Sequence, residues 1–592
     1  MLSFRKNRGF TIVELIIVIV VIGILAAVSI VAYNGVTRNA IENSVVSDAD
    51  GVESLATRYT LKNSTDSSSA LDWYSPQGAN LTLDFTPSNS NIIDIVTAGN
   101  DFCIRVYNPN SQTYNSIFLS VKRESSPGAC DEIAPSAQAV ADGGGEGSKL
   151  VRSIATGYFY TCGVAYDSSL YCWGIGTDGQ LGNGTTSYWY APRAVINTGV
   201  LLDEVFVKFA GLSDNSTDKY TCIVALSKRA YCWGDNAYGQ LGNNETTNSS
   251  VPVAVDTSGI LAGKNIASLG ISDYSFNTCA LTEDNILACW GRNHFGQLGN
   301  NSTADSAVPV AVDTSGVLSG KTVEQLVVDS SGAVCTLTSD NGLYCWGSGT
   351  SGQLGNGVMA NSSVPVAVDM SGVLAGKTVQ KLMSKNSRFC ALTTDSKLFC
   401  WGHNFGGKLG NNSTTNSSVP VAVDTSGVLS GKTIKSVALG LFSSCVVASD
   451  DKLYCWGTGT SGQLGNGVMA NSSVPVAVDM SGVLAGKTIK TLQINSNQIC
   501  VIASDSQLYC WGLNTYGQLG NNSTADSAVP VAVDTSGVLS GKTIKSVALG
   551  GYHGCAIASD NRAYCWGLNG YGQLGKGSPG NSSVPVLVTD FQ

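Results

Sequence analysis

Sixteen of the eighteen cysteines in this chain stand in eight pairs, and the two members of each pair are ten positions apart. In the segment CVVASDDKLYC, a hairpin that turns about Asp450 places Cys445 opposite Cys455. Directly opposed residues of a non-hydrogen-bonded strand pair lie close to the reach of a disulfide. We therefore expect one disulfide in each pair, with a packed column of free thiols as the alternative. The pairs are Cys162 with Cys172, Cys222 with Cys232, Cys279 with Cys289, Cys335 with Cys345, Cys390 with Cys400, Cys445 with Cys455, Cys500 with Cys510, and Cys555 with Cys565.

Other residues of catalytic type do not form a coherent site in the sequence. His294, His403 and His553 have no Ser or Asp at a repeated spacing, so no catalytic triad is expected. No zinc site is expected, because CxxC pairs are missing and the histidines are scattered. The repeated strings GVLSGKT and GVLAGKT have three residues between their glycines, whereas a phosphate-binding loop needs four, so we interpret them as turns. We expect neither an enzyme nor a bound cofactor.

One carboxylate, Glu14, lies near the start of the apolar run of residues 10–32. At about 1.5 Å per residue, a helix of this length can cross the hydrocarbon core of a membrane. The basic residues Arg5, Lys6 and Arg8 precede it and predict a cytoplasmic N-terminus. A secretory signal peptide would have a shorter apolar region and a small-residue cleavage site. Because a charge inside a membrane segment is costly, Glu14 indicates a function.

The paired cysteines lie in a repeated region, residues 149–592. A string of the form CWG-x4-G-Q/K-LG occurs eight times there, and its last five copies are 55 residues apart. Each repeat has about four short apolar runs between turns, which is typical of one propeller blade. The string resembles the RCC1 repeat family, whose members are mostly seven-bladed. We expect an all-β propeller of eight blades, with seven blades and a displaced unit as the alternative, and Trp173 and its equivalents packed between blades.

The segment GFTIVEL at residues 9–15 closely resembles the prepilin motif of type IV pilins and pseudopilins. The resemblance implies that a prepilin peptidase removes the leader 1–9 by cleaving between Gly9 and Phe10, and that Phe10 is then N-methylated. It also implies that Glu14 pairs with the terminal amine of a neighbouring pilin subunit, and that inner-membrane machinery assembles the fibre. This chain departs from many members in having Val31 where they carry a helix-kinking proline.

The resemblance further implies an α+β pilin domain over residues 10–133, with a long helix over 10–62 packed on a small antiparallel sheet. The strand candidates are residues 81–85, 92–96, 102–107 and 116–122. Cys103 and Cys130 are the two cysteines of this region, and a disulfide between them is similar to the one that closes the C-terminal loop of many pilins. Two unpaired buried thiols are the alternative. Small residues and a glycine triplet in 134–148 predict a flexible linker.

Recognition residues are expected in loops that differ between otherwise similar repeats. The segments before each first cysteine and the four residues after each Trp-Gly vary most. Aromatic residues and arginine are typical interface anchors, although neutral drift in exposed loops is the alternative reading. The candidate ligand-binding residues are Tyr238, Arg292, His294, Phe295, Phe405 and Tyr516.

These patterns together predict a type IV pilus subunit, minor or at the fibre tip, whose propeller is an adhesin that binds a protein or glycan surface ligand. A pseudopilin-like component of a secretion or DNA-uptake machine is the alternative. With a net charge of −9 and without Lys/Arg clusters, the chain is not expected to bind nucleic acid. We expect the subunit in the cytoplasmic membrane before assembly, with the propeller outside, and at the cell surface in the pilus afterwards.

Overall fold

The computed structural model describes the chain as two compact units, residues 1–145 and 146–592. The boundary falls within the stretch that the sequence predicts as a linker. The expected helix over 10–62 and the residue Cys130 lie outside the described residues. Among the described residues, no helix is long and apolar enough to span a membrane. The described residues are 81–83, 92–98, 101–107, 117–121 and 150–589 without 198, 203, 207–208, 213–218 and 273.

The N-terminal unit contains a four-stranded antiparallel sheet in the order β1-β2-β3-β4. The sequence predicted a small antiparallel sheet here, and the structure confirms it. The hairpin between β2 and β3 is tighter than predicted, because Ala98 pairs with Asp101 and only two residues connect the strands. Cys103 lies on β3, opposite Val96 and Ser120. The strands are β1 (Leu81–Leu83), β2 (Ile92–Ala98), β3 (Asp101–Tyr107) and β4 (Ile117–Val121).

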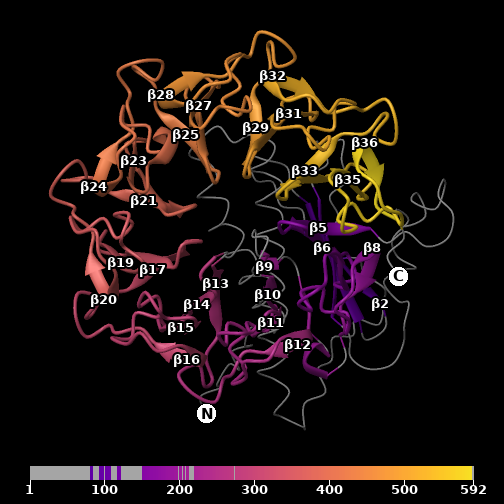
Figure 1. The fold of residues 1–592 in the computed structure, drawn as a ribbon. Coiled ribbons are helices and arrows are strands. Elements are labelled where there is room, and N and C mark those ends of the chain that lie inside the picture. The colour runs from indigo at the N-terminus through magenta and orange to yellow at the C-terminus, as the bar shows by residue number, and fades with distance from the viewer. Residues whose placement is uncertain are drawn as a thin grey trace, which may run out of the picture. The chain divides into compact units, whose positions relative to one another are not determined.

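The second unit is a propeller of eight four-stranded antiparallel blades arranged in a ring (Figure 1). Each blade consists of four consecutive strands, and the first strand of each lies nearest the centre of the ring. Two short 3-10 helices, η2 (Gly199–Leu201) and η3 (Phe405–Gly407), lie in the loops. The structure therefore confirms eight blades and excludes seven with a displaced unit.

The strands of blades 1 to 4 are β5 (Val151–Thr156), β6 (Tyr160–Ala165), β7 (Leu170–Gly174) and β8 (Trp189–Ala194); β9 (Phe209–Leu212), β10 (Tyr220–Val224), β11 (Ala230–Gly234) and β12 (Ser249–Ala254); β13 (Ile266–Ile271), β14 (Asn277–Thr282), β15 (Leu287–Gly291) and β16 (Ser306–Ala311); β17 (Val323–Val328), β18 (Ala333–Thr338), β19 (Leu343–Gly347) and β20 (Ser362–Ala367). Those of blades 5 to 8 are β21 (Val379–Ser384), β22 (Arg388–Thr393), β23 (Leu398–Gly402) and β24 (Ser417–Ala422); β25 (Ile434–Leu439), β26 (Ser443–Ala448), β27 (Leu453–Gly457) and β28 (Ser472–Ala477); β29 (Ile489–Ile494), β30 (Gln498–Ala503), β31 (Leu508–Gly512) and β32 (Ser527–Ala532); β33 (Ile544–Leu549), β34 (His553–Ala558), β35 (Ala563–Gly567) and β36 (Ser582–Leu587).

The burial of each strand follows from its place in the blade. The third strand of every blade, such as β27, is fully buried. The second strand of every blade is also buried, except for the last residue of β10, because neighbouring blades cover both faces. Such strands have continuous runs of small and apolar residues rather than alternation. The outer strands are mostly part-buried and carry a buried proline in the middle, for example Pro475 in β28. A proline lacks the N–H that would pair with another chain, so it protects the exposed edge of each blade from aggregation.

All eight expected propeller disulfides are present, one between the second and third strands of each blade, so the alternative of free thiols is wrong for these cysteines. Cys445 lies opposite Cys455 in the register, and their Cα atoms are 4.1 Å apart. Val447 lies opposite Leu453, as the hairpin about Asp450 requires. This separation is typical of a non-hydrogen-bonded antiparallel pair. The disulfides are buried and join strands within a blade, so they do not tie the blades to one another.

The confirmed pairs are the same as those that the sequence predicted. They join Cys162 to Cys172, Cys222 to Cys232, Cys279 to Cys289, Cys335 to Cys345, Cys390 to Cys400, Cys445 to Cys455, Cys500 to Cys510, and Cys555 to Cys565. The expected disulfide between Cys103 and Cys130 stays a prediction, because Cys130 lies outside the described residues.

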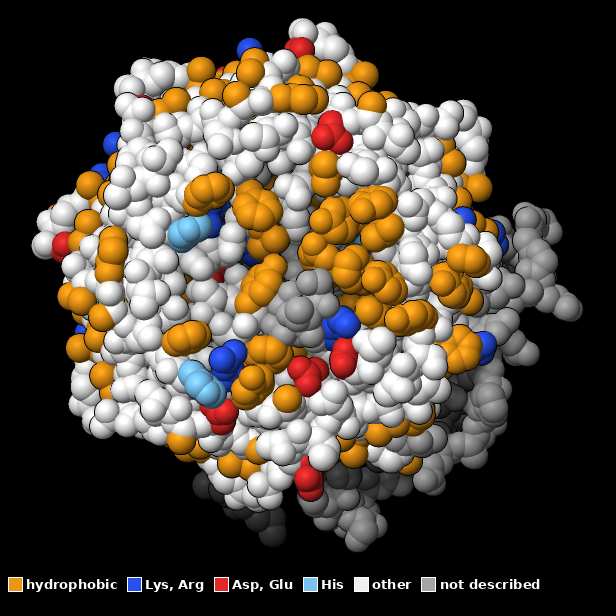
Figure 2. Space-filling model, viewed as in Figure 1, with side chains coloured by type: hydrophobic (Ala, Val, Ile, Leu, Met, Phe, Trp, Pro, Cys, Tyr) orange, Lys and Arg blue, Asp and Glu red, His pale blue; other side chains and the backbone are white. Residues whose placement is uncertain are grey.

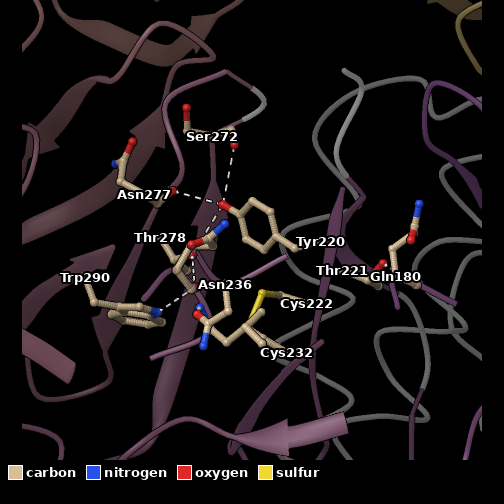
Figure 3. Close-up of a disulfide and its surroundings, with 12 residues drawn as sticks. Gln180, Tyr220, Thr221, Cys222, Cys232, Asn236, Ser272, Asn277, Thr278 and Trp290 are labelled. Carbon is tan, nitrogen blue, oxygen red and sulfur yellow. Dashed lines mark hydrogen bonds between the residues drawn. A yellow bond between two sulfur atoms is a disulfide. The ribbon is translucent and has the colours of Figure 1, made fainter. Parts of the chain in front are cut away.

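The Trp-Gly strings hold neighbouring blades together. Figure 3 shows this between blades 2 and 3, where the Trp290 indole donates a hydrogen bond of 3.0 Å to the Gln240 carbonyl. The Thr278 hydroxyl donates to the same carbonyl at 3.0 Å, and Tyr220 of blade 2 donates to the Asn277 carbonyl of blade 3 at 3.1 Å. The eight tryptophans are fully buried, which confirms that they pack between blades.

The same contacts close the ring between blade 8 and blade 1. The Trp173 indole donates to the Gln573 carbonyl at 3.0 Å. The Gly577 amide donates to the Tyr190 carbonyl at 2.7 Å. All the other blade junctions have the equivalent backbone hydrogen bond. A Cβ atom on Gly575 would lie 2.7 Å from the Trp173 indole nitrogen, so only glycine fits there. The apolar core accordingly consists of eight clusters, one at each junction.

Candidate ligand-binding face

The two variable segments of each repeat lie on the same face of the propeller. Successive strands of a blade run in opposite directions, so the turn between strands 1 and 2 and the loop between strands 3 and 4 meet at one end. We call this end the loop face. Figure 2 shows it: pale blue histidine side chains are visible there, and the described histidines that are not buried belong to loops between strands 3 and 4. Hydrophobic side chains gather around the centre of this face in the view.

The opposite face repeats one arrangement with little variation. In four of the five GKT strings the lysine lies over the tyrosine of a YCWG string; the Lys432 ammonium, for example, is 4.9 Å from the Tyr454 ring centroid. The Tyr454 hydroxyl donates to Asp450 at 2.7 Å. The GKT strings are therefore turns held by neighbouring side chains. Residues 350–378 are identical to residues 460–488; they include one such turn and also most of a loop between strands 3 and 4. The segments before the first cysteines differ in every blade, so variation on the loop face is concentrated in them.

Across four blade junctions, the variable residues form complementary pairs. The fourth residue after Trp-Gly of one blade meets the third residue before the first cysteine of the next. The junction of blades 1 and 2 has a salt bridge of 3.3 Å between Asp178 and Lys219. Three other junctions have two aromatic rings instead, with centroids about 5 Å apart. These pairs are Tyr238–Phe276 at 4.9 Å, Tyr516–Tyr552 at 5.3 Å and Tyr571–Phe159 at 4.8 Å.

Two of the aromatic pairs merge into one patch over blades 7, 8 and 1. The Tyr158 ring lies between them, 5.6 Å from Tyr552 and 4.6 Å from Phe159, in edge-to-face geometry. Tyr188 adds a sixth ring, 5.4 Å from Tyr571. Tyr188 is 46% exposed and Tyr516 37% exposed, so the patch presents rings to solvent. We call Tyr158, Phe159, Tyr188, Tyr516, Tyr552 and Tyr571 the aromatic patch.

The third aromatic pair carries an arginine. The Arg292 guanidinium lies 4.9 Å from the Tyr238 ring centroid and 5.9 Å from that of Phe276. Its Nε donates to His294 Nδ1 at 3.4 Å, and this His294 nitrogen lies 3.3 Å from Asp305. We call Tyr238, Phe276, Arg292 and His294 the arginine cluster.

The six predicted ligand-binding residues thus lie on one face but at three places. Tyr238, Arg292 and His294 come together in the arginine cluster. Phe295 follows His294 in the same loop and is 36% exposed. Tyr516 belongs to the aromatic patch. Phe405 is 66% exposed on blade 5, with its ring 6.5 Å from that of His403.

Sequence reasoning missed Phe276 and five members of the aromatic patch. Tyr158, Phe159, Phe276 and Tyr552 lie in the segments before the first cysteines, which the sequence does show to be variable. Tyr571 occupies the same position after Trp-Gly as the predicted Tyr238 and Tyr516. The signal that would have found them is the pairing of these two variable positions across a blade junction.

A buried cluster of charges also lies below the loop face, at blades 4, 5 and 6. Lys408 replaces the glutamine of the GQLG string, and its ammonium donates to the Asn386 carbonyl at 2.6 Å. Burial, and then the Arg388 charge, lower the pKa of Lys408 to about 6. Burial lowers the pKa of Arg388 to about 9, while the Asp329 carboxylate opposes that change. Arg388 joins blades by donating to the Gly440 and Ser443 carbonyls at 2.7 and 2.8 Å.

His553 is a packing residue at the ring closure. It is fully buried, and its Nε2 lies 2.9 Å from the Thr161 hydroxyl of blade 1. Burial lowers its pKa to about 3, so the ring is neutral at physiological pH. Among the described residues, no group of three or more His, Cys, Asp and Glu side chains is placed to hold a metal ion.

Family models match both ends of the chain. An RCC1-like domain matches residues 317–592, and RCC1 repeats match 151–180, 229–265, 272–297 and 287–326. A prokaryotic N-terminal methylation motif matches residues 4–30. This motif implies processing by a prepilin peptidase, membrane insertion and pilus-type assembly, and the buried disulfides fit a propeller outside the cytoplasm.

Curated relatives are similar to the propeller. The E3 ubiquitin-protein ligase HERC2 of Homo sapiens is 27% identical over 378 residues, which are 63% of this chain and only 7% of HERC2. The ultraviolet-B receptor UVR8 of Arabidopsis thaliana is 26% identical over 368 residues, 62% of this chain and 79% of the receptor. The solved structure of Prp20p from Saccharomyces cerevisiae is 20% identical, with a TM-score of 0.49, and covers 68% of this chain and 91% of Prp20p. This chain combines a prokaryotic N-terminal methylation motif with an RCC1-repeat β-propeller.

Proposed function

We propose that this chain is a type IV pilus subunit, minor or at the tip, that displays its propeller as an adhesive head. The N-terminal helix joins the fibre, with Glu14 paired to the amine of a neighbouring subunit. The linker over 134–148 separates this assembly segment from the head. The head binds a surface ligand and performs no catalysis.

The aromatic patch is the observation that carries the adhesive role. Exposed clusters of large rings on a soluble surface mark interaction sites more often than isolated apolar residues do. Tyrosine is enriched among residues that dominate binding energy, because its ring offers contact area at low entropic cost. The pairing of ring with ring at three junctions and of charge with charge at a fourth supports selection at these positions over neutral drift. The repeated opposite face lacks comparable variation and serves as scaffold.

A pseudopilin-like role in secretion or DNA uptake is the second candidate, and the methylation motif favours both equally. The two candidates differ in what the head contacts. An adhesin needs an exposed recognition surface on the head, which the aromatic patch supplies. Direct DNA binding would need a positive surface, whereas the chain has a net charge of −9.

The triple variant Tyr188→Ser, Tyr516→Ser and Tyr571→Ser tests the adhesive role. Each side chain contributes about 1–2 kcal/mol if it is an interface anchor, so attachment of piliated cells to their natural surface should fall more than tenfold. Attachment is measured by counting bound cells under flow. The control Val358→Ser changes an apolar side chain that is 54% exposed in the loop between β19 and β20, outside the patch, and should attach as the wild type does. Equal attachment of the triple variant and the wild type would contradict the adhesive role of the patch.

A further inference from the structure

Arg292 occupies a position where the two other blades that have an aromatic pair at the same junction place an aliphatic side chain. The first residue after Trp-Gly is Ile175 in blade 1 and Leu568 in blade 8. Like Arg292, each belongs to a junction where an aromatic pair forms on the loop face. An aliphatic side chain is therefore compatible with such a junction. Packing alone does not require a guanidinium in the arginine cluster, so the arginine indicates a further role.

The guanidinium is held in place but keeps free donors. Two aromatic rings and the His294 nitrogen fix its plane through the contacts described above. Its Nη atoms have no hydrogen-bond partner among the described residues, and no carboxylate there forms an ion pair with it. A guanidinium presents paired N–H groups in a fork that matches a carboxylate with two parallel hydrogen bonds. Because its orientation is already fixed, little side-chain entropy would be lost on binding.

We propose that the arginine cluster binds the carboxylate of an acidic saccharide, such as a uronic acid residue. This inference rests on the proposed adhesive function and names the ligand class of one site on the same face. The two Nη atoms of Arg292 donate to the carboxylate, and the sugar ring lies over the loop that carries Arg292 and His294, in which Phe295 is 36% exposed.

The surroundings favour a saccharide over an acidic peptide. Peptides are commonly captured by an exposed sheet edge, a groove for a helix, or an aromatic-lined polyproline groove. The outer edge strands carry prolines in every blade, for example Pro309 in β16, and they lie at the rim of the ring. The arginine cluster is built from loop side chains rather than from a strand edge. Its aromatic rings and its one guanidinium therefore suit a compact ligand, such as one acidic sugar residue.

The test compares Arg292→Leu with the wild type. Blade 8 has a leucine, Leu568, at the position equivalent to 292. The fold of the variant should therefore be retained. Binding of oligogalacturonate to the detergent-solubilised full chain is measured by calorimetry, with neutral oligogalactose and polyglutamate as comparison probes. We expect binding of oligogalacturonate alone, weakened more than about tenfold by the substitution because two charge-assisted hydrogen bonds are lost. Arg292→Lys keeps the charge without the fork, so its affinity for oligogalacturonate should lie between those of the wild type and Arg292→Leu.

Each other outcome would overturn the proposal of an acidic-saccharide site. Equal affinity of Arg292→Leu and wild type would show that Arg292 does not contact the ligand. Binding of polyglutamate but not of oligogalacturonate would assign the site to an acidic peptide, and binding of neither would exclude the proposed ligand. The adhesive function is judged separately: attachment that survives Arg292→Leu but is lost in the triple tyrosine variant would keep the adhesin and remove only this site.

Discussion

Replacing Trp173 by alanine should lower the free energy of unfolding of the propeller by about 3–5 kcal/mol, the usual cost of deleting a fully buried large aromatic side chain. Trp173 is 0% exposed and belongs to the apolar cluster that contains Leu574 and Val588 of blade 8. Its indole hydrogen bond to the Gln573 carbonyl would also be lost. The free energy of unfolding is measured by denaturant titration with the disulfides intact. Because the disulfides lie within blades, this measurement reports on the junction that closes the ring.

The matched control for this substitution is Phe405→Ala, which removes an aromatic ring that is 66% exposed. Exposed substitutions usually change stability by no more than about 0.5 kcal/mol. If Trp173→Ala proved as stable as this control, blades 8 and 1 would not be joined through the indole, and the closed ring of eight blades would be wrong.

Replacing Glu14 by valine should leave stable membrane-bound protein that fails to enter fibres. If the carboxylate pairs with the terminal amine of a neighbouring subunit in lipid, removing one partner leaves an uncompensated charge at a cost of about 3–5 kcal/mol. That corresponds to more than about a hundredfold loss of subunit incorporation. Immunoblots of sheared fibres and of membranes give the two populations.

Thr11→Val is the control for Glu14→Val, because it removes a polar group of the same apolar run without removing a charge. The control should enter fibres as the wild type does. Normal incorporation of Glu14→Val would show that charge pairing is not needed for assembly of this subunit. Loss of both variants from the membrane would instead place the defect in insertion.

The blade interior could be predicted from the sequence because it depends on local spacing. The ten-residue separation of Cys445 and Cys455 leaves one symmetrical hairpin, so register, disulfide and turn follow together. The number of blades followed from counting complete repeats. In the N-terminal unit the strands were found to within a few residues, but the β2–β3 hairpin was tighter than predicted because strand ends depend on turn geometry rather than on apolar pattern.

The composition of the loop face could not be predicted in the same way. Tyr571 and Phe159 are far apart in the chain, and they meet only because blade 8 closes on blade 1. The place of Arg292 over two rings likewise depends on a contact between successive blades, which no pattern within one repeat encodes. In the sequence, Lys408 is only a single departure from the GQLG string. Its low pKa arises from burial and from the nearby charge of Arg388 in the same blade, and the sequence pattern shows neither.

Immunogold imaging of purified pili with an antibody raised against the propeller tests the central claim most directly. We expect labelled fibres, with gold at the tip or at sparse positions along the shaft, and no labelling of fibres from a strain that lacks this chain. Propeller that is found only in the membrane fraction, with every fibre unlabelled, would contradict the account of this chain as a pilus subunit that displays a binding head.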